Sequence, residues 1–146
     1  MGAAISPASE AVVAAARHWL GTPYRHRASL RGVGCDCIGL VRGVWRDLGG
    51  DVPQRLPLYA PDWAEATGDE LLLRGLAAHF CSASLDCLTP GMIVAFRWRE
   101  GCVAKHAAIL AGPDRMIHVH QGIAVSEVSL NPWWLRRLAA AFLFNI

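Results

Sequence analysis

The sequence predicts an α+β fold in which N-terminal helices pack on an antiparallel β-sheet of about five strands. Apolar residues recur at helical spacing only up to about residue 80, and segments rich in strand formers follow one another from Met92 to the C-terminus. Helices followed by a meander of strands are typical of the α+β class. The chain has 146 residues and shows no repeat, low-complexity segment or linker, so we expect a single domain over residues 1–146.

The first helix is predicted to begin at Ser6-Pro7, because proline is favoured at the first position of a helix. Gly21-Thr22-Pro23 should end it, and residues 24–34 should form a loop. The apolar face of this helix consists of Val12, Val13, Ala16, Trp19 and Leu20.

The clearest element is a second helix within "GVGCDCIGLVRGVWRDLGG", residues 32–50. Asp36 is a residue type that favours the N-cap position, and Gly49-Gly50 should stop the helix. Its apolar positions recur at helical spacing and are Cys37, Leu40, Val41, Val44, Trp45 and Leu48.

A third helix is predicted after a loop. Residues 51–61 contain three prolines and should be irregular. Thr67-Gly68-Asp69-Glu70 matches a capping box, which predicts a helix from there to about Phe80.

Five strands are predicted in the rest of the chain. Gly112-Pro113-Asp114 should be the turn between the second and the third strand, and Asn131-Pro132 should cap a short helical turn before the last one. The strands are expected at Met92–Trp98, Lys105–Ala111, Arg115–His120, Ile123–Val128 and Ala140–Ile146.

Composition and charge exclude several classes of function. The formal charge is +2 and the 14 Lys and Arg residues form no basic stripe, so we predict no nucleic-acid partner. No apolar run approaches the roughly 18 residues of a membrane span. A hydrophobic fraction of 53% is high for a free monomer and indicates a surface that packs against a partner. The five cysteines are an odd number with no visible export signal, so we expect no disulfide framework. A bond between Cys81 and Cys87 is the alternative to the simpler interpretation that both are buried free thiols.

Cys37 is the candidate nucleophile. With Asp36 at the N-cap, Cys37 becomes the first helical residue, where unpaired backbone N–H groups and the helix dipole favour the thiolate. Cys35 precedes the cap, so the helix start stabilises its thiolate much less. We therefore expect Cys37 to react rather than Cys35, although these residues alone leave open that Cys37 is a buried apolar residue of the helix face.

His106 and His118 are the candidate partners of the thiol, because a cysteine nucleophile needs a base and a third group that orients the base. If a three-residue loop, Ala111–Pro113, joins the two strands, Leu110 pairs with Asp114, and His106 then falls opposite His118 on the same face of the sheet. His120 shares that face one step further along. The alternative is two unrelated histidines on strands.

Several motifs together resemble the NlpC-type cysteine peptidases of bacterial cell walls, which have a papain-like core. The family's Asp-Cys-Ser-Gly-Leu motif opens a helix and carries the nucleophile. It corresponds here to Asp36-Cys37-Ile38-Gly39-Leu40. Gly-Thr-Pro-Tyr, His-Val-Gly-Ile-Tyr and Ile-His elements of the family match Gly21–Tyr24, His106–Leu110 and Ile117-His118, and a Pro-Gly-Asp-Leu-Val-Phe strand loosely matches Pro90–Phe96. Ile38 replaces the usual serine and His26 stands where the family often has tryptophan, which bears on substrate preference.

This resemblance implies an endopeptidase that hydrolyses peptidoglycan stem peptides at the bond between D-glutamate and diaminopimelate. Cys37 would attack the carbonyl, His106 would pair with the thiol and return its proton to the leaving amine, and His118 would orient His106. The backbone N–H of Cys37 would help to bind the oxyanion, and Tyr24 would lie beside the nucleophile. The resemblance implies no cofactor and no metal.

Three other interpretations stay open. The same core also serves amidases and acyl transferases on other acyl groups. The chain is alternatively a structural tail or baseplate component that has lost activity. A metal site built from Cys35, Cys37 and histidines is the third interpretation, but the C-x-C spacing is short and no second cysteine pair with ligand-like spacing follows.

Residues 34–50 most resemble a subgroup encoded with phage tails and gene transfer agents. The first twenty residues show no export signal, so we expect assembly in the cytoplasm onto tail or baseplate proteins of a phage-like particle. That particle would carry the enzyme to the wall of the next cell, where a local opening lets DNA pass. The candidate docking residues are Trp63, Trp98, Trp133 and Trp134.

Overall fold

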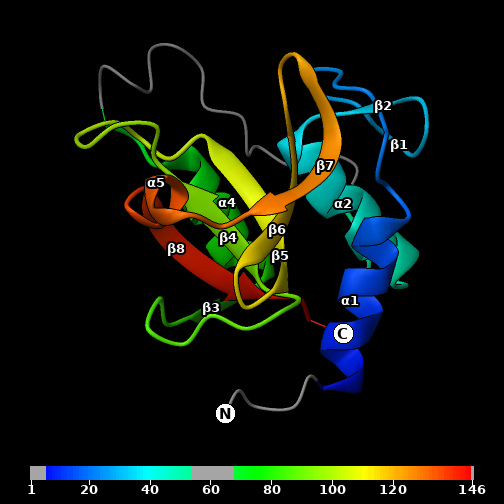
Figure 1. Ribbon diagram of the computed structural model, residues 1–146, viewed down its shortest axis with the longest axis horizontal. Coiled ribbons are helices and arrows are strands. Elements are labelled where there is room, and N and C mark those ends of the chain that lie inside the picture. The colour runs from blue at the N-terminus through cyan, green and yellow to red at the C-terminus, as the bar shows by residue number, and fades with distance from the viewer. Residues whose placement is uncertain (1–5, 54–67, 146) are drawn as a thin grey trace.

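The computed structural model describes residues 6–53 and 68–145, and it has the predicted α+β architecture (Figure 1). The predictions on Trp63, on Thr67 and on most of the proline-rich loop lie outside the described residues. The main sheet is antiparallel and has six strands in the order β3-β8-β4-β5-β6-β7. The strands are β3 (Cys81–Ala83), β4 (Ile93–Phe96), β5 (His106–Gly112), β6 (Arg115–His120), β7 (Ile123–Ser129) and β8 (Leu138–Leu143).

The sixth strand, β3, is absent from the sequence prediction. It is three residues long and pairs only with β8, at the edge of the sheet. A segment this short carries no readable alternation of apolar and polar residues. Its Cys81 is exposed, as is Cys87 in the turn that follows, so the prediction that these two thiols are buried is wrong. All five cysteines are free.

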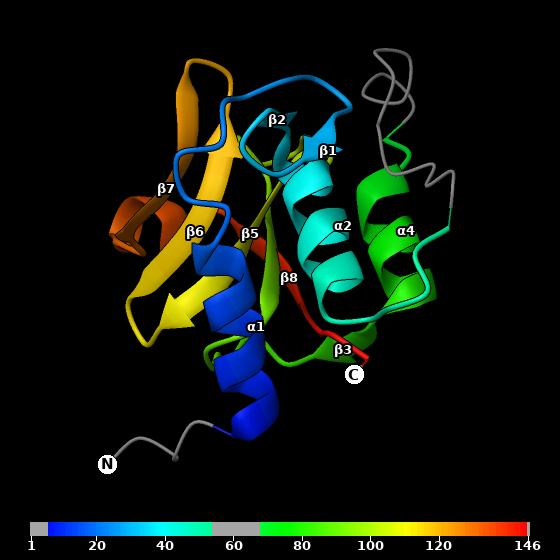
Figure 2. The same cartoon turned by 90° about the vertical axis from the view of Figure 1, so that its right-hand side faces the viewer.

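Helices cover one face of the sheet, and a shorter helix lies on the other. α1 (Pro7–Arg17), α2 (Cys37–Asp47) and α4 (Leu71–His79) stand side by side in Figure 2 and share one apolar core with the sheet. α5 (Pro132–Leu135) lies on the opposite face, where Trp134 packs on a second apolar cluster that includes Phe96 and Leu110. Among the described residues, no helix has both the length and the apolar character needed to cross a bilayer.

The contact between α1 and α2 depends on one tryptophan and one glycine. A Cβ atom at Gly43 would lie 2.0 Å from Cζ2 of Trp19, so the indole occupies the space that a side chain at position 43 would need. The indole Nε1 of Trp19 donates to Oδ2 of Asp47 at 2.8 Å, one helical turn further along α2. α1 itself ends at Arg17, and residues 18–21 form a turn rather than the last helical residues predicted.

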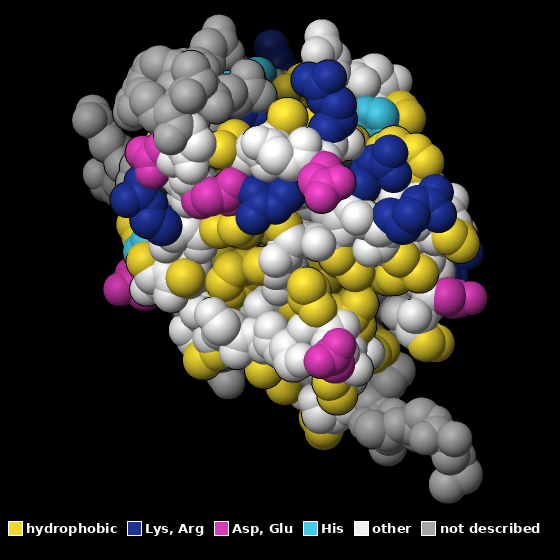
Figure 3. Space-filling model, turned by 90° about the vertical axis from the view of Figure 1, so that its left-hand side faces the viewer, with side chains coloured by type: hydrophobic (Ala, Val, Ile, Leu, Met, Phe, Trp, Pro, Cys, Tyr) yellow, Lys and Arg dark blue, Asp and Glu magenta, His cyan; other side chains and the backbone are white. Residues whose placement is uncertain are grey.

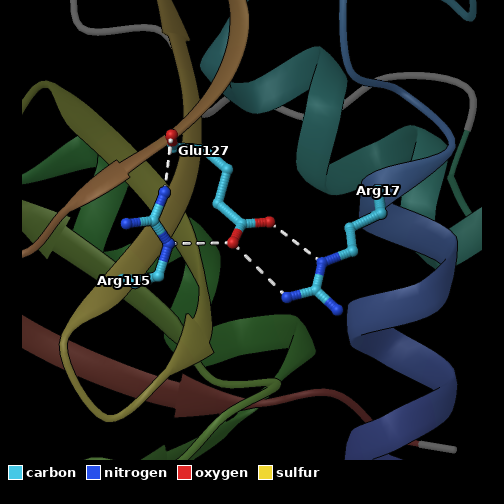
Figure 4. Close-up of polar contacts among 3 residues, drawn as sticks. All are labelled: Arg17, Arg115 and Glu127. Carbon is cyan, nitrogen blue, oxygen red and sulfur yellow. Dashed lines mark hydrogen bonds and ion pairs between the residues drawn. The ribbon is translucent and has the colours of Figure 1, made fainter.

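An ion-pair network ties α1 to the far hairpin of the sheet. The carboxylate of Glu127 on β7 accepts from Nε of Arg17 on α1 and from Nε of Arg115 on β6, each at 2.9 Å (Figure 4). The two guanidinium groups hold the pKa of Glu127 below its usual value. Both arginines are about half exposed, so we expect this network to orient α1 more than to stabilise it.

α4 begins later in the chain than the sequence predicted. The helix begins at Leu71 with Glu70 at the N-cap, so the prediction of a start near Thr67 is wrong. The physical reason is that the Glu70 carboxylate is engaged elsewhere. It accepts from Nη1 of Arg97 at 2.5 Å and from the backbone N–H of Ala104 at 3.3 Å. These contacts join α4 to both ends of the loop between β4 and β5.

The hairpin of β5 and β6 contains a bulge. Gly112 pairs with Arg115, which leaves a turn of two residues rather than the three predicted. Leu110 then pairs with Met116, so Ala111 has no partner of its own. The predicted pairing of Leu110 with Asp114 is therefore wrong.

The bulge decides on which face the two histidines lie. A two-residue turn alone would put His106 and His118 on opposite faces of the sheet, because side chains alternate along each strand. The unpaired residue shifts the register by one and returns both to the same face. They are diagonal neighbours rather than directly opposite, and their rings are in contact.

Candidate active site

Asp36 fixes the start of α2, as predicted. It is 4% exposed, and its Oδ1 accepts from the backbone N–H of Gly39 at 2.7 Å, which is an N-cap contact. Its Oδ2 accepts from the backbone N–H of Arg27 at 2.6 Å, so the same carboxylate also holds the preceding loop. Cys37 is consequently the first residue of α2, and it is half-buried.

The Cys37 thiol lies against the start of β5, the strand that carries His106. Its Sγ is 4.0 Å from the carbonyl oxygen of Lys105, and a backbone hydrogen bond from Ala107 also reaches the sulfur. The residues on either side of His106 therefore border the thiol. Cys35, in contrast, is fully buried in the apolar core on β2 (Gly34–Cys35). The structure thus separates the two cysteines as the N-cap argument predicted.

The expected lowering of the Cys37 pKa does not occur. Burial is the largest effect and raises the pKa of the Cys37 thiol to about 12. Hydrogen bonds from the backbone N–H groups of Ala107, Ile38 and Cys37 act in the opposite direction, as expected at a helix start. Because desolvation outweighs them, the free protein holds Cys37 as a thiol. The prediction of a thiolate is wrong for this state.

His106 and His118 form a buried pair. Nε2 of His106 lies 3.0 Å from Nδ1 of His118, and the two residues are 2% and 3% exposed. Burial, together with the neighbouring histidines, lowers the pKa of His106 to about 3 and that of His118 to about 4. Both imidazoles are therefore neutral at neutral pH. The third histidine, His120, is less buried, and its ring centroid lies 6.1 Å from that of His106.

Two tryptophans cover the His106 ring. The Trp98 ring stacks on it with 5.0 Å between centroids, and the Trp134 ring does so at 5.5 Å. Trp134 also contacts His118 edge to face. From the sequence, Trp98 and Trp134 were predicted only as docking candidates, because no local pattern shows that α5 returns to β5. The resulting environment is apolar, which is why both histidine pKa values fall.

The remaining residues singled out by sequence occupy distinct places. Tyr24 is half-buried beside the site, and burial is the largest effect that raises the pKa of its hydroxyl, followed by the neighbouring Asp36 carboxylate. Ile38, which replaces the family's serine, is 3% exposed and belongs to the core under α2. His26 is exposed, with its Nδ1 3.9 Å from Oδ2 of Asp36.

Metal ligation has no support among residues 6–53 and 68–145. No three His, Cys, Asp or Glu side chains of that part of the chain come together as a ligand set. Of the docking candidates, Trp98 and Trp133 are exposed and Trp134 is half-buried. Figure 3 shows the side of the molecule that carries α5 and β8, where apolar side chains gather below a band of charged ones.

Comparison with known proteins identifies the fold. The model of the NlpC/P60 family matches residues 21–141 of the chain. No protein of curated function matches the chain in sequence.

Solved structures of this family have the same fold. A Bacillus cereus NlpC/P60 family protein superposes with a TM-score of 0.70 and 21% identity, over 93% of this chain and 40% of its own. NlpC2 from Trichomonas vaginalis superposes with a TM-score of 0.69 and 16% identity, over 94% of this chain and 46% of its own. The NlpC/p60 domain of the peptidoglycan hydrolase SagA superposes with a TM-score of 0.66 and 22% identity, over 92% of this chain and 97% of its own. The chain spans less than half the length of the first two proteins.

Proposed function

The chain belongs to the NlpC/P60 family, and on that basis we propose that it is a cysteine peptidase that hydrolyses peptidoglycan stem peptides. The observation that carries this proposal is the position of Cys37, at the start of α2 and against the residues that flank His106. The contact between His106 and His118 supplies the base and the group that orients it. SagA, whose domain has this fold, is a peptidoglycan hydrolase.

The raised pKa of the Cys37 thiol and the lowered pKa of His106 favour general-base catalysis that starts from a neutral thiol and a neutral imidazole. Nε2 of His106 lies 3.0 Å from Nδ1 of His118. The proposed mechanism uses the tautomer in which Nε2–H of His106 donates to His118, so that Nδ1 of His106 accepts the proton. As the thiol sulfur attacks the scissile carbonyl carbon, its proton passes to this Nδ1 and the carbonyl π electrons move to oxygen. The backbone N–H of Cys37 binds the oxyanion, and Tyr24 lies beside it.

The second half of the reaction returns the site to its starting state. The tetrahedral intermediate expels the amine, which takes the proton from His106, and a thioester on Cys37 remains. Water then attacks the thioester with His106 as its base, and the carboxylic acid leaves as the thiol re-forms. We further propose that the cleaved bond joins D-glutamate to diaminopimelate, from the resemblance of the Asp36–Leu40 motif to NlpC-type peptidases.

The protein reaches the wall, in this proposal, on a phage-like tail or baseplate. The resemblance of residues 34–50 to proteins encoded with phage tails and gene transfer agents supports it, as do the exposed Trp98 and Trp133. The enzyme would assemble in the cytoplasm and then act on the wall of the next cell. Purified particles should contain the protein, and its restriction to the free cytosolic fraction would refute the carrier while leaving the peptidase proposal intact.

The peptidase proposal is tested by replacing the proposed nucleophile, Cys37. Cys37→Ala should lower hydrolysis of purified sacculi by on the order of 10⁴-fold or more, because the nucleophile is removed. Cys35→Ala is the matched control and should keep most of the activity, since Cys35 is a core residue. Zymography followed by mass spectrometry of the released muropeptides measures both the rate and the bond.

Each alternative function gives a different result in this experiment. Equal losses in the two folded variants would contradict a single working thiol. Products that lack new stem-peptide ends would indicate an amidase or acyl transferase instead. Sacculi left intact by the wild type would indicate an inactive structural component.

A further inference from the structure

Arg137 fixes the backbone of the tryptophan that covers His106. This arginine follows α5, and its Nε donates to the carbonyl oxygen of Trp98 at 3.2 Å. Its Nη1 donates to the carbonyl oxygen of Trp133 at 2.7 Å, and its guanidinium carbon lies 3.6 Å from the centre of the Trp133 ring. The backbone N–H of Arg97 donates to the carbonyl oxygen of Arg137 at 2.9 Å. The segment after β4 and the segment after α5 are therefore joined around one arginine.

Trp98 is the aromatic neighbour of His106 that reaches the surface. The rings of Phe96, Trp98 and Trp134 contact the His106 ring, with 5.9, 5.0 and 5.5 Å between centroids. Phe96 is fully buried and Trp134 is half-buried, whereas Trp98 is 37% exposed. His106 is nevertheless only 2% exposed. The indole of Trp98 thus separates the base from bulk water on this side of the ring.

The hydrogen bond that orients His106 joins two uncharged rings. Nε2 of His106 lies 3.0 Å from Nδ1 of His118, and burial keeps the pKa of each imidazole well below neutral. A carboxylate in the place of His118 would hold the ring by charge as well as by a hydrogen bond. A neutral acceptor holds it less strongly, so a water molecule that reaches Nε2 competes with His118. Exclusion of water is therefore part of what keeps the His106 ring in place.

Burial, rather than a nearby charge, is the main influence on the protonation of His106. The neighbouring His118 and His120 also lower its pKa, but burial is the larger effect. A change in the cover over His106 should therefore be visible in its titration. The ionisable groups on the surrounding elements are His118 and His120 on β6, Cys37 and Asp36 at the start of α2, Tyr24 in the loop before α2, Lys105 next to His106 on the chain, and Arg137 on the Trp98 carbonyl.

We propose that Trp98 is a positioning residue for the base: its indole, fixed by Arg137, keeps water from the His106–His118 hydrogen bond and so holds Nδ1 of His106 in place for the thiol proton. This inference rests on the proposed function, since it takes His106 as the base. Trp98 itself takes no part in bond making. Its removal should admit water to the histidine pair, weaken their hydrogen bond and raise the pKa of His106 towards the ordinary value.

Replacement of the indole tests the inference through the pH profile. Trp98→Ala should move the acid limb of kcat/KM upwards by about one pH unit or more, towards the ordinary histidine value of about 6.5. At neutral pH it should lower kcat by about 10- to 100-fold with little change in KM, because the base rather than the substrate is misplaced. Trp98→Phe retains an aromatic cover and should restore most of the wild-type profile and of kcat.

Two further variants separate the cover from the exposed aromatic surface. Trp133→Ala is the matched control, because it removes an exposed indole whose ring packs against Trp98 and Trp134 rather than against His106. It should keep the wild-type pH profile. Arg137→Met leaves both indoles in the chain but removes the donors that fix them, so it should shift the acid limb in the same direction as Trp98→Ala and by less. It provides the test if Trp98→Ala does not fold.

NMR titration of the histidine rings in the Cys37→Ala chain separates this inference from the proposed function, because it needs no turnover. The His106 signals should not titrate above about pH 5 while Trp98 is present, and they should do so once Trp98→Ala is added. A titration unchanged by Trp98→Ala, or shifted equally by Trp133→Ala, would overturn the inference and leave the peptidase proposal standing. An unchanged kcat in Trp98→Ala would also overturn it. Sacculi left intact by the wild type, together with the expected shift in titration, would overturn the peptidase proposal and leave the cover over His106 standing.

Discussion

Desolvation is the dominant influence on the ionisable residues of the site. The helix start does supply N–H groups to the Cys37 sulfur, yet burial raises the pKa of this thiol to about 12. The same apolar surroundings lower the pKa of His106 to about 3. Proton transfer from sulfur to nitrogen is therefore a step that substrate binding and attack must drive, rather than a condition already met in the free protein.

The first prediction at the residue scale concerns the pH dependence of hydrolysis. The reaction needs His106 as a neutral base, so protonation of His106 removes activity. Because its pKa is lowered to about 3, activity should persist well below the ordinary histidine value of about 6.5. The measurement is kcat/KM against pH with a short soluble peptide. An acid limb with its midpoint near 6.5 would show that His106 is not the base or is not buried during catalysis.

The second prediction ranks the three histidines. His106→Ala should cause the largest loss of turnover, His118→Ala a smaller one, and His120→Ala the mildest, because the hydrogen-bond contact of His106 Nε2 is with His118 and not with His120. His118→Asn should recover part of the activity, since its side-chain oxygen can accept from that N–H. Single-turnover kinetics on folded variants test this order, and a His120→Ala defect as large as that of His118→Ala would contradict it.

At the scale of elements, sequence patterns predicted which segments form better than how they pair. The N-caps Ser6, Asp36 and Asn131 start helices as expected, because capping depends on residues within one turn. The register of β5 and β6 depends on a bulge at Ala111, which no sequence signal marks. The predicted turn is one residue too long, and the bulge was not predicted. Each of these errors alone would move one histidine to the other face of the sheet, so together they leave His106 and His118 on the same face, as predicted.

Contacts between distant elements account for the other errors. Glu70 fits a capping box locally, but its carboxylate bonds to Arg97 and Ala104, far along the chain. The cover over His106 comes from Trp98 and Trp134, which precede β5 and follow β7 respectively. Local periodicity contains no information on such partners. The position of Cys37 at the start of α2 was therefore predictable, and the pKa shifts of Cys37, His106 and His118 were not.

The third prediction, at this scale, concerns the crossing of α1 and α2. Gly43→Ala should improve helix propensity by about 1 kcal/mol. The new methyl group, however, would lie 2.0 Å from the Trp19 ring, and overpacking of this kind costs about 1–3 kcal/mol. We therefore expect net destabilisation in urea unfolding, of up to about 2 kcal/mol.

A double variant isolates the clash. Trp19→Phe removes the atoms that meet the new methyl group, so Gly43→Ala should be neutral or stabilising in the Trp19→Phe background. If Gly43→Ala stabilises the wild type as well, the indole does not determine how closely α1 and α2 approach.

At the scale of the whole molecule, the apolar composition has a structural explanation. The sheet is covered on both faces, by α1, α2 and α4 on one side and by α5 with its neighbouring loops on the other. Two cores in one small protein require a large share of apolar residues. The hydrophobic fraction is thus weaker evidence for a docking surface than the sequence suggested, and the exposed Trp98 and Trp133 are the better evidence.

The second core also buries ionisable groups, which links the stability of the fold to pH. His106 and His118 have folded-state pKa values of about 3 and about 4, whereas an unfolded chain has about 6.5. Between these values the unfolded state binds more protons than the folded one, so the free energy of unfolding falls as the pH falls. Well above pH 6.5 both states hold neutral imidazoles and the effect is absent.

The last prediction follows from this linkage. Urea midpoints of the wild type should fall from about pH 6.5 towards pH 4, each buried histidine contributing a slope of up to about 1.4 kcal/mol per pH unit. His118→Gln replaces one titrating ring by a neutral amide and should flatten the decline, even if it lowers stability at pH 7.5. Parallel declines in the wild type and in His118→Gln would mean that the histidine pair is not buried in neutral form. The same result would remove the reason to expect activity to persist far below pH 6.5.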